Sequence, residues 1–319
     1  MPYPREVAQD KVLNNIASYY GHEGCVYKEV APIVDINHIS GKYYVFGREE
    51  LRVMNDTLGR RSHANELDWH VTTAQYRTVP RGLRSFIGQE DRENADPPIQ
   101  LETTTTEKLI RALDLAAEVR LVAALDAAIT ATSNTAAGTD WSTGGTTGTP
   151  LTDIATAKRN FRRNCGVEPN AIVIPDDLAD YMVLCDEWKE NFTYTVGGDS
   201  RIAKYDALPP SILGMKPLVP KQLKLSGSPG VSDGLGPGGT PTLTGVWAGT
   251  KVYLLHINPR PSIMTATCAY TLTTTRQRTR RYDDESVGIG GGMWIQVEKQ
   301  DVIKVVNAWM VRTITGLTG

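Results

Sequence analysis

The stretch LETTTTEKLIRALDLAAEVRLVAALDAAITATSN, residues 101–134, predicts one long helix around which the rest of the chain is organised. It follows a proline pair, and Thr104 with Glu107 three residues later can form a capping box. We expect a helix of about 28 residues, ~42 Å long, within this stretch, and place it at 104–133. Apolar residues at steps of three and four form one alanine-rich stripe along it: Ile110, Leu113, Ala117, Leu121, Ala124 and Ala128.

A second apolar group lies well round the same helix, and charged residues separate it from the first. Its members are Leu115, Val119, Val122 and Ile129, and the charged residues in between are Glu107, Arg111, Asp114 and Glu118. A helix at the edge of an ordinary domain needs only one apolar stripe. We therefore expect this helix to lie on its own sheet and to be covered by a further segment. Burial inside a large monomer is the alternative.

Length and composition exclude several classes of protein. A chain of 319 residues can bury a full core, as two domains or as one elaborate domain. With a net charge of -2, the chain lacks the excess of basic residues that is typical of a sequence-reading nucleic-acid binder. The chain has no apolar run of about 18 residues and no targeting pattern, so we expect neither a membrane-spanning nor a secreted protein. The cysteines are far apart and predict free, buried thiols: Cys25, Cys165, Cys185 and Cys268.

The N-terminal part of the chain predicts segments without a core of their own. Residues 1–20 can form a short helix, and 21–40 are expected to be an extended arm. Tyr43–Phe46 and Leu67–Tyr76 are strand-like, with a polar segment between them. This pattern predicts a long hairpin with a charged tip. Because an isolated two-stranded ribbon is marginal in water, the hairpin should lie on another surface.

Beyond the long helix and a low-complexity linker over 135–150, the pattern changes to alternating helices and strands. We expect a helix capped by Thr152 or Asp153 and ending at Gly166, then a strand over 171–174 and a helix starting at Pro175-Asp176. A glycine-rich loop over 226–245 leads to a strand over 251–257. The chain closes with long strands, and the apolar run 302–314 predicts one strand buried on both faces.

No constellation of residues predicts catalysis, a cofactor or a metal. The five histidines lack metal-ligand spacing. Gly288–Gly292 precedes a strand-like segment rather than a helix, so it predicts a turn and not a phosphate-binding loop. Asp283, Asp284 and Glu285 could bind a cation or act as paired carboxylates, but they lie beside four arginines in 276–281, so we expect them to form salt bridges.

The order of these parts carries a family resemblance. An arm precedes the hairpin around 48–77, and Asp96-Pro97 precedes the run from Leu101-Glu102 into the long helix. The sequence GVEPNAIVI at 166–174 and a β-rich end complete the order. Taken whole, the chain resembles the major capsid protein of tailed bacteriophages, with the Hong Kong ninety-seven (chainmail) fold. The resemblance covers nearly the whole chain and lies in the order of the parts, because no single motif is specific.

The resemblance implies an α+β capsid fold made of five segments. They are an N-terminal arm at 1–42, an extended hairpin (E-loop) at 43–77, a peripheral domain at 78–150 with the spine helix at 104–133, an α/β axial domain at 151–258, and peripheral strands at 259–319. It implies a structural protein without catalytic activity that assembles as hexamers and pentamers into an icosahedral phage head around double-stranded DNA. The expected locations are the virion and, during assembly, the host cytoplasm.

The implied partners are further copies of the chain, a scaffolding protein, a portal, a decoration protein and DNA contacted without sequence specificity, but no membrane. Two alternatives remain. An encapsulin-type shell has the same fold and encloses enzymes, and a soluble enzyme with an unrecognised site is the more distant possibility. The candidates for inter-subunit contacts are charged: Arg48, Arg52, Arg60, Arg61, Arg276, Arg278, Arg280, Asp283, Asp284 and Glu285.

The arginines at 276, 278 and 280 would point to one face of a strand at about 6.7 Å spacing, which is too repulsive to leave unpaired if the face is even partly buried. A solvated edge strand, pairing with acidic residues of a neighbouring subunit, and contact with packaged DNA are all compatible with this pattern. The archetype of the fold crosslinks a hairpin lysine to an asparagine of a neighbour. Between Tyr43 and Leu101 this chain has arginines but no lysine, so we expect a non-covalent shell.

Overall fold

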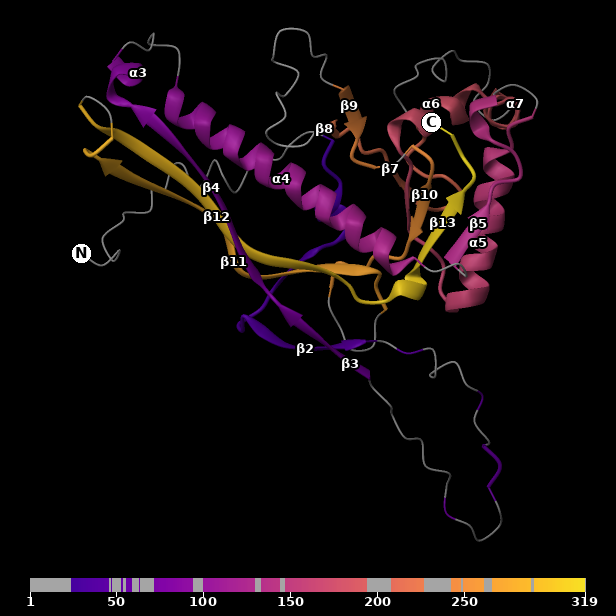
Figure 1. Ribbon diagram of the computed structural model, residues 1–319. Coiled ribbons are helices and arrows are strands. Elements are labelled where there is room, and N and C mark those ends of the chain that lie inside the picture. The colour runs from indigo at the N-terminus through magenta and orange to yellow at the C-terminus, as the bar shows by residue number, and fades with distance from the viewer. Residues whose placement is uncertain are drawn as a thin grey trace.

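The computed structural model describes most of the chain: residues 24–45, 72–93, 100–129, 133–143, 147–193, 208–226, 242–247, 249–260, 266–287 and 290–318, with a few single positions between 47 and 63. Figure 1 shows an elongated sheet with helix α4 (Leu101–Ala128) along it, and a group of shorter strands and helices at the C-terminal end of α4. The α+β fold class predicted from the sequence is confirmed.

The elongated sheet has four strands in the order β1-β11-β12-β4. Their bounds are β1 (Ile33–Asp35), β4 (Val79–Gly88), β11 (Ala269–Asp284) and β12 (Gly292–Val305). β1 pairs with β11 in parallel, whereas β11 with β12 and β12 with β4 pair antiparallel. Gly290 and Gly291 precede β12 with φ of 84° and 78°, which glycine adopts without steric cost. This part of the glycine-rich segment is a turn, as predicted.

Helix α4 occupies Leu101–Ala128 instead of the expected 104–133. Thr104 lies inside the helix, where its hydroxyl donates to the Gln100 carbonyl at 3.0 Å, so the predicted capping box does not form. The threonine run does not delay the helix, because these hydroxyls bond to carbonyls four residues earlier; Thr106 donates to Glu102 at 2.8 Å. At the other end, Ile129 is already extended.

The two halves of α4 pack against different cores. In the first half, Ile110 and Leu113 form a cluster with Val297 of β12. In the second half, residues of both apolar groups join the large core of the shorter strands and helices: Leu115, Ala117, Val119, Leu121, Val122, Leu125 and Ile129. The helix therefore lies on its own sheet and is also covered by other segments, as its two apolar groups predicted.

One covering segment comes from the N-terminal part of the chain, and we call residues 24–31 the strap. It contains the one-turn helix α2 (Tyr27–Val30), and its apolar side chains belong to the large core: Val26, Tyr27, Val30 and Ala31. The expected extended arm is therefore wrong for the strap. Its apolar residues are too few to show a period, and it packs on a helix about 90 positions away. The short helix expected within 1–20 lies outside the described residues.

The second group of elements is built on a five-stranded sheet in the order β5-β13-β10-β6-β7. Its strands are β5 (Asn134–Ala136), β6 (Ala171–Val173), β7 (Lys216–Leu218), β10 (Val252–Leu255) and β13 (Val311–Thr315). Its helices are α5 (Pro150–Cys165), α6 (Asp176–Leu184) and α7 (Asp186–Thr193), with the 3-10 turn η4 (Trp141–Thr143). The α/β pattern predicted here is confirmed.

The details of α5 differ from the prediction at one end only. The helix begins at Pro150 after Thr149, so neither Thr152 nor Asp153 is its N-cap. Asp153 instead accepts hydrogen bonds from the Gly138 amide and the Trp141 indole, both at 2.9 Å. At the other end Gly166 has φ of 71° and caps the helix, as predicted.

The apolar run 302–314 is not one strand, which corrects the prediction. β12 ends at Val305, a 3-10 turn η6 (Ala308–Met310) follows, and β13 then joins the other sheet. Buried Asn307 turns the chain there and donates to the Thr267 carbonyl at 3.2 Å. In the sequence, an apolar run looks the same whether it forms one strand or two strands in different sheets. The α/β unit therefore also includes β5 and β13, outside the expected 151–258.

Two ribbons complete the fold. β2 (Ser40–Val45) pairs antiparallel with β3 (Thr72–Arg77), which confirms the base of the predicted hairpin. Its tip, with Arg48, Arg52, Arg60 and Arg61, lies outside the described residues. β8 (Leu223–Ser226) pairs with β9 (Thr242–Gly245) and closes the predicted glycine-rich loop. The short helix α3 (Gln89–Glu93) follows β4.

Candidate functional site

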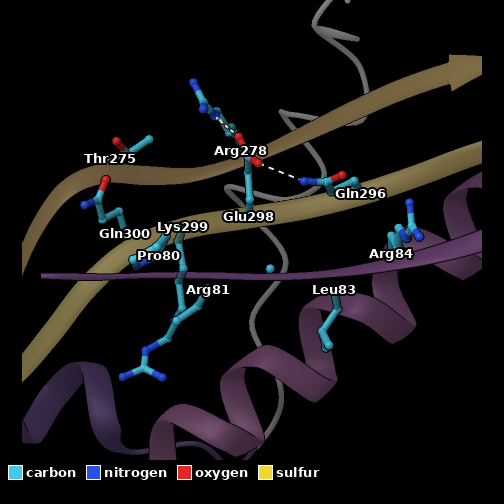
Figure 2. A pocket seen from close by; sticks show the side chains of 11 residues that line it. Pro80, Arg81, Leu83, Arg84, Thr275, Arg278, Gln296, Glu298, Lys299 and Gln300 are labelled. Carbon is cyan, nitrogen blue, oxygen red and sulfur yellow. Dashed lines mark hydrogen bonds and ion pairs between the residues drawn. The ribbon is translucent and has the colours of Figure 1, made fainter. Parts of the chain in front are cut away.

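The face of the long sheet that points away from α4 carries a groove of about 530 Å³. On β12, residues at alternate positions from Met293 to Asp301 are buried on the α4 side, so Gln296, Glu298 and Gln300 point to the open face. The lining residues come from three strands: Pro80, Arg81, Gly82, Leu83, Arg84, Thr275, Arg278, Gln296, Glu298, Lys299 and Gln300 (Figure 2).

The groove is hollow for two local reasons. Gly82 carries no side chain, and a Cβ there would lie 3.2 Å from the Val297 carbonyl oxygen and 3.3 Å from the Glu298 Cβ. In β11 the pairing register shifts between Thr273 and Thr275 and again before Arg278. A bulge in β11 and a glycine in β4, on either side of β12, therefore leave room for an extended segment.

Basic side chains outnumber acidic ones around the groove. Glu298 forms ion pairs with Arg278 and with Arg280, the latter at 3.0 Å, and accepts a hydrogen bond from Gln296 at 2.9 Å. Figure 2 shows Glu298 reaching toward both Arg278 and Gln296. On the neighbouring strand, the Arg84 guanidinium lies 4.3 Å from the centre of the Trp294 ring. Two guanidinium groups on one carboxylate, with a third close by, suit an anionic partner.

Arg276 does not belong to this cluster. Its guanidinium pairs with Asp35 of β1, with the Nε atom 3.0 Å from a carboxylate oxygen. This contact lowers the pKa of Asp35 below its ordinary value. The register shift before Arg278 separates Arg276 from the other two arginines, so the expected ladder of three on one face does not form. The acids that partner all three arginines lie in the same subunit, and their contact with a neighbour stays a prediction.

The acidic run at 283–285 also differs from its prediction. Asp284 accepts hydrogen bonds from the Ser286 hydroxyl at 2.5 Å, the Ser286 amide at 3.0 Å and the Trp294 indole at 3.1 Å, and these bonds lower its pKa. It stabilises the turn after β11 instead of pairing with the arginine run. Arg281 pairs with Glu102 of α4 at 3.1 Å, because it points to the helix side of the sheet.

Two buried carboxylates on α4, which the sequence did not single out as functional, hold the strap. Asp114 accepts a hydrogen bond from the Tyr27 hydroxyl at 2.7 Å and pairs with Lys28 at 3.3 Å. Glu118 accepts from the Tyr27 amide at 3.0 Å and the Trp247 indole at 2.7 Å. Burial raises the pKa of Glu118, although these donors oppose the shift. The signal available in the sequence was this pair of acidic residues, one helical turn apart and between the two apolar groups of α4.

The described residues contain no group of three His, Cys, Asp or Glu side chains arranged to hold a metal ion. Burial raises the pKa of both Cys25 and Cys268 to about 12, so these thiols stay protonated and are poor nucleophiles at neutral pH. All four cysteines are free. In the described part of the chain, no helix is both long enough and apolar enough to span a membrane.

Comparison with known proteins gives a family and a fold. The family model described as phage capsid protein matches residues 72–294. No curated protein matches this chain. Among solved structures, a phage-related protein from Bordetella bronchiseptica is 20% identical over 97% of both chains, with a TM-score of 0.70.

Two further structures come from capsids. The capsid protein of cyanophage P-SCSP1u is 10% identical over 100% of this chain and 93% of its own, with a TM-score of 0.61. The putative capsid protein of an E. coli prophage is 10% identical over 97% of this chain and 99% of its own, with a TM-score of 0.59. At these identities the structures show a shared fold.

The family match runs from β3 to the start of β12 and so includes α4, β4, β11 and most of the α/β unit, but neither β13 nor the β12 residues that line the groove. The fold similarity extends over nearly the entire chain. This chain therefore belongs to the phage capsid protein family, and it is a structural protein of the phage capsid.

Proposed function

We propose that this chain assembles, through rings of six and of five copies, into a closed icosahedral shell around double-stranded DNA. The observation that carries the proposal is the open face of the long sheet, which no described segment of the same subunit covers at the groove. The β2–β3 ribbon extends away from the sheet (Figure 1). Two different surface patches that bind each other head to tail generate rings when the rotation closes.

In this assembly, the hairpin of one copy lies across the groove of the next. The hairpin sequence between β2 and β3 carries both signs of charge, including Glu49, Glu50 and Asp56 as well as the arginines at 48, 52, 60 and 61. In this proposal its acidic side chains pair with the guanidinium groups of Arg84, Arg278 and Arg280 of the next copy. The hairpin arginines pair with carboxylates of the neighbour, so salt weakens these contacts.

The work of the chain in this proposal is self-association without a catalytic step. A scaffolding protein and a portal join it during assembly in the host cytoplasm, and a decoration protein joins the finished virion. Packaged DNA contacts the shell through phosphates, which require positive charge but no sequence recognition.

Electron microscopy of the purified chain tests the proposal, with Arg84→Glu as the diagnostic variant. We expect closed shells from the wild type and unassembled subunits with unchanged circular dichroism from the variant. Lys108→Glu makes the same charge change on an exposed position of α4 and should still give shells. Normal shells from Arg84→Glu would contradict the role of the groove. Wild-type protein that never forms shells, or shells that hold protein cargo instead of DNA, would contradict the proposed function itself.

A further inference from the structure

Glu118 joins three parts of the subunit that are far apart in sequence. Its Oε1 atom accepts hydrogen bonds from the Val26 amide at 3.3 Å and from the Trp247 indole at 2.7 Å, and its Oε2 atom accepts one from the Tyr27 amide at 3.0 Å. The side chain is fully buried. One carboxylate on α4 therefore holds both the strap and the residue that follows the β8–β9 ribbon.

Burial makes these contacts interdependent. An ionised carboxylate that loses its water needs hydrogen bonds to offset a cost of several kcal/mol. When the strap covers Glu118, part of that cost is already met, and the indole of Trp247 then binds a carboxylate that has no competing water. When Trp247 is in place, its bond likewise offsets part of the cost, and the strap amides then bind a carboxylate that has no competing water. Two segments that share one buried acceptor thus stabilise each other.

The strap has a second attachment one turn earlier on the same helix. The Tyr27 hydroxyl donates to Asp114 at 2.7 Å, and Lys28 pairs with the other oxygen of that carboxylate at 3.3 Å. Because Tyr27 also donates its backbone amide to Glu118, a change at its hydroxyl acts on the position of that amide. A change at the Tyr27 hydroxyl therefore alters the hydrogen bonding of Glu118 without changing Trp247 itself.

Trp247 in turn fixes the base of the β8–β9 ribbon. Its ring packs edge-on against Tyr253, with centroids 5.2 Å apart, and the preceding Val246 amide donates to the Gln222 carbonyl at 2.9 Å. The ribbon beyond this base carries exposed leucines that are 46–60% accessible: Leu223, Leu225 and Leu243. The position of these apolar side chains therefore depends on the anchoring of Trp247.

We infer that Glu118 couples the strap to the β8–β9 ribbon, so that release of the strap from α4 and loosening of the ribbon occur as one event. In a subunit that assembles, a force on the segment before residue 24 would be transmitted to the β8–β9 ribbon through this carboxylate. The coupling is a property of the single subunit and does not depend on the proposed shell.

Hydrogen exchange of the full-length, unassembled chain tests the coupling. Trp247→Phe removes the indole donor together with part of the ring. We expect the Val26 and Tyr27 amides, more than 200 positions away, to exchange about tenfold faster, in the range of couplings through a shared partner. Trp141→Phe is the matched control, because it removes an equally buried indole bond to the Asp153 carboxylate at 2.9 Å. It should leave the exchange of these two amides unchanged.

The reverse direction uses Tyr27→Phe, which keeps the ring and removes the hydroxyl bond to Asp114. We expect faster exchange of the Trp247 indole proton in this variant, and Glu118→Gln should accelerate exchange in both segments together. The inference is overturned if Trp247→Phe leaves the strap amides within twofold of the wild type, or if Trp141→Phe accelerates them equally. If Trp247→Phe does not fold, the response of the Trp247 indole to Tyr27→Phe decides in the same way.

Discussion

Several charged side chains have partners that are distant in the sequence. Arg276 pairs with Asp35, Arg278 pairs with Glu298, and both carboxylates come from other strands. Asp140 is another case, because it accepts hydrogen bonds from the Thr318 amide and the Ser142 amide at 3.0 and 3.1 Å and also bonds the Thr318 hydroxyl. These donors lower the pKa of Asp140 to about 2 and hold the C-terminal residues on the α/β unit.

The Asp140 contacts predict a defined pH dependence. A carboxyl whose pKa falls from 3.8 to about 2 on folding stabilises the native state above pH 3.8 and loses that contribution as the pH falls toward 2. We expect Asp140→Asn to lower the free energy of unfolding by a constant amount between pH 5 and 8, and by less below pH 4. Urea denaturation at each pH measures the difference.

Asp283→Asn is the control for this series, because Asp283 is exposed and no donor to it is found among the described contacts. Its unfolding free energy should track the wild type at every pH. A difference between wild type and Asp140→Asn that grows on acidification would contradict the assignment.

At the scale of elements, α4 contributes side chains to two hydrophobic cores. Its first half packs on β12 and its second half on the α/β unit and the strap. Two apolar groups on one helix are the sequence signature of this double role. Because the helix is shared, a defect in either half weakens the connection between the long sheet and the α/β unit.

Removal of one buried side chain from the first half of α4 tests this role. Ile110 is fully buried against Val297, so Ile110→Ala should lower the free energy of unfolding by about 2 to 5 kcal/mol. Ile39→Ala deletes the same atoms at a position that is 56% exposed and should cost less than about 0.5 kcal/mol. Thermal or urea denaturation measures both, and equal losses would show that this packing is unimportant.

At the scale of the whole molecule, we predict that the proposed shell holds without a covalent bond from the hairpin. Crosslinking needs an amine nucleophile, and arginine cannot replace lysine because its guanidinium stays protonated. Between Tyr43 and Leu101 the chain has no lysine. Lys42 lies in β2 at the base of the hairpin, and Lys108 lies in α4.

Boiling assembled particles in detergent, followed by a denaturing gel, tests the absence of crosslinks. We expect one band near 35 kDa, the mass of the single chain. A ladder of multimers that survives a reducing agent would show that another nucleophile crosslinks the subunits. Particles assembled from the wild type and heated without detergent provide the intact reference.

Residues close together in the sequence determined the elements that were predicted well. α5 ends at Gly166 because glycine adopts the left-handed cap conformation. α6 starts at Asp176, directly after Pro175, and the acidic side chains of Asp176 and Asp177 favour the first turn of a helix. The two apolar groups of α4 follow from its own helical period. The order of these parts was enough to indicate the capsid fold.

The tertiary structure alone decided where segments distant in the sequence meet. The strap packs on α4, Asp35 reaches Arg276, and the chain changes sheet at Asn307, yet none of these follows from a local period. Pairing of a charge depends on the register and bulges of strands more than 200 positions apart, since a shift of one residue moves a side chain to the opposite face. The sequence by itself therefore determined most of the helices and strands and their order. Only packing decided where the run 302–314 changes sheet, that the strap joins the core, and which carboxylate each arginine and each backbone amide would find.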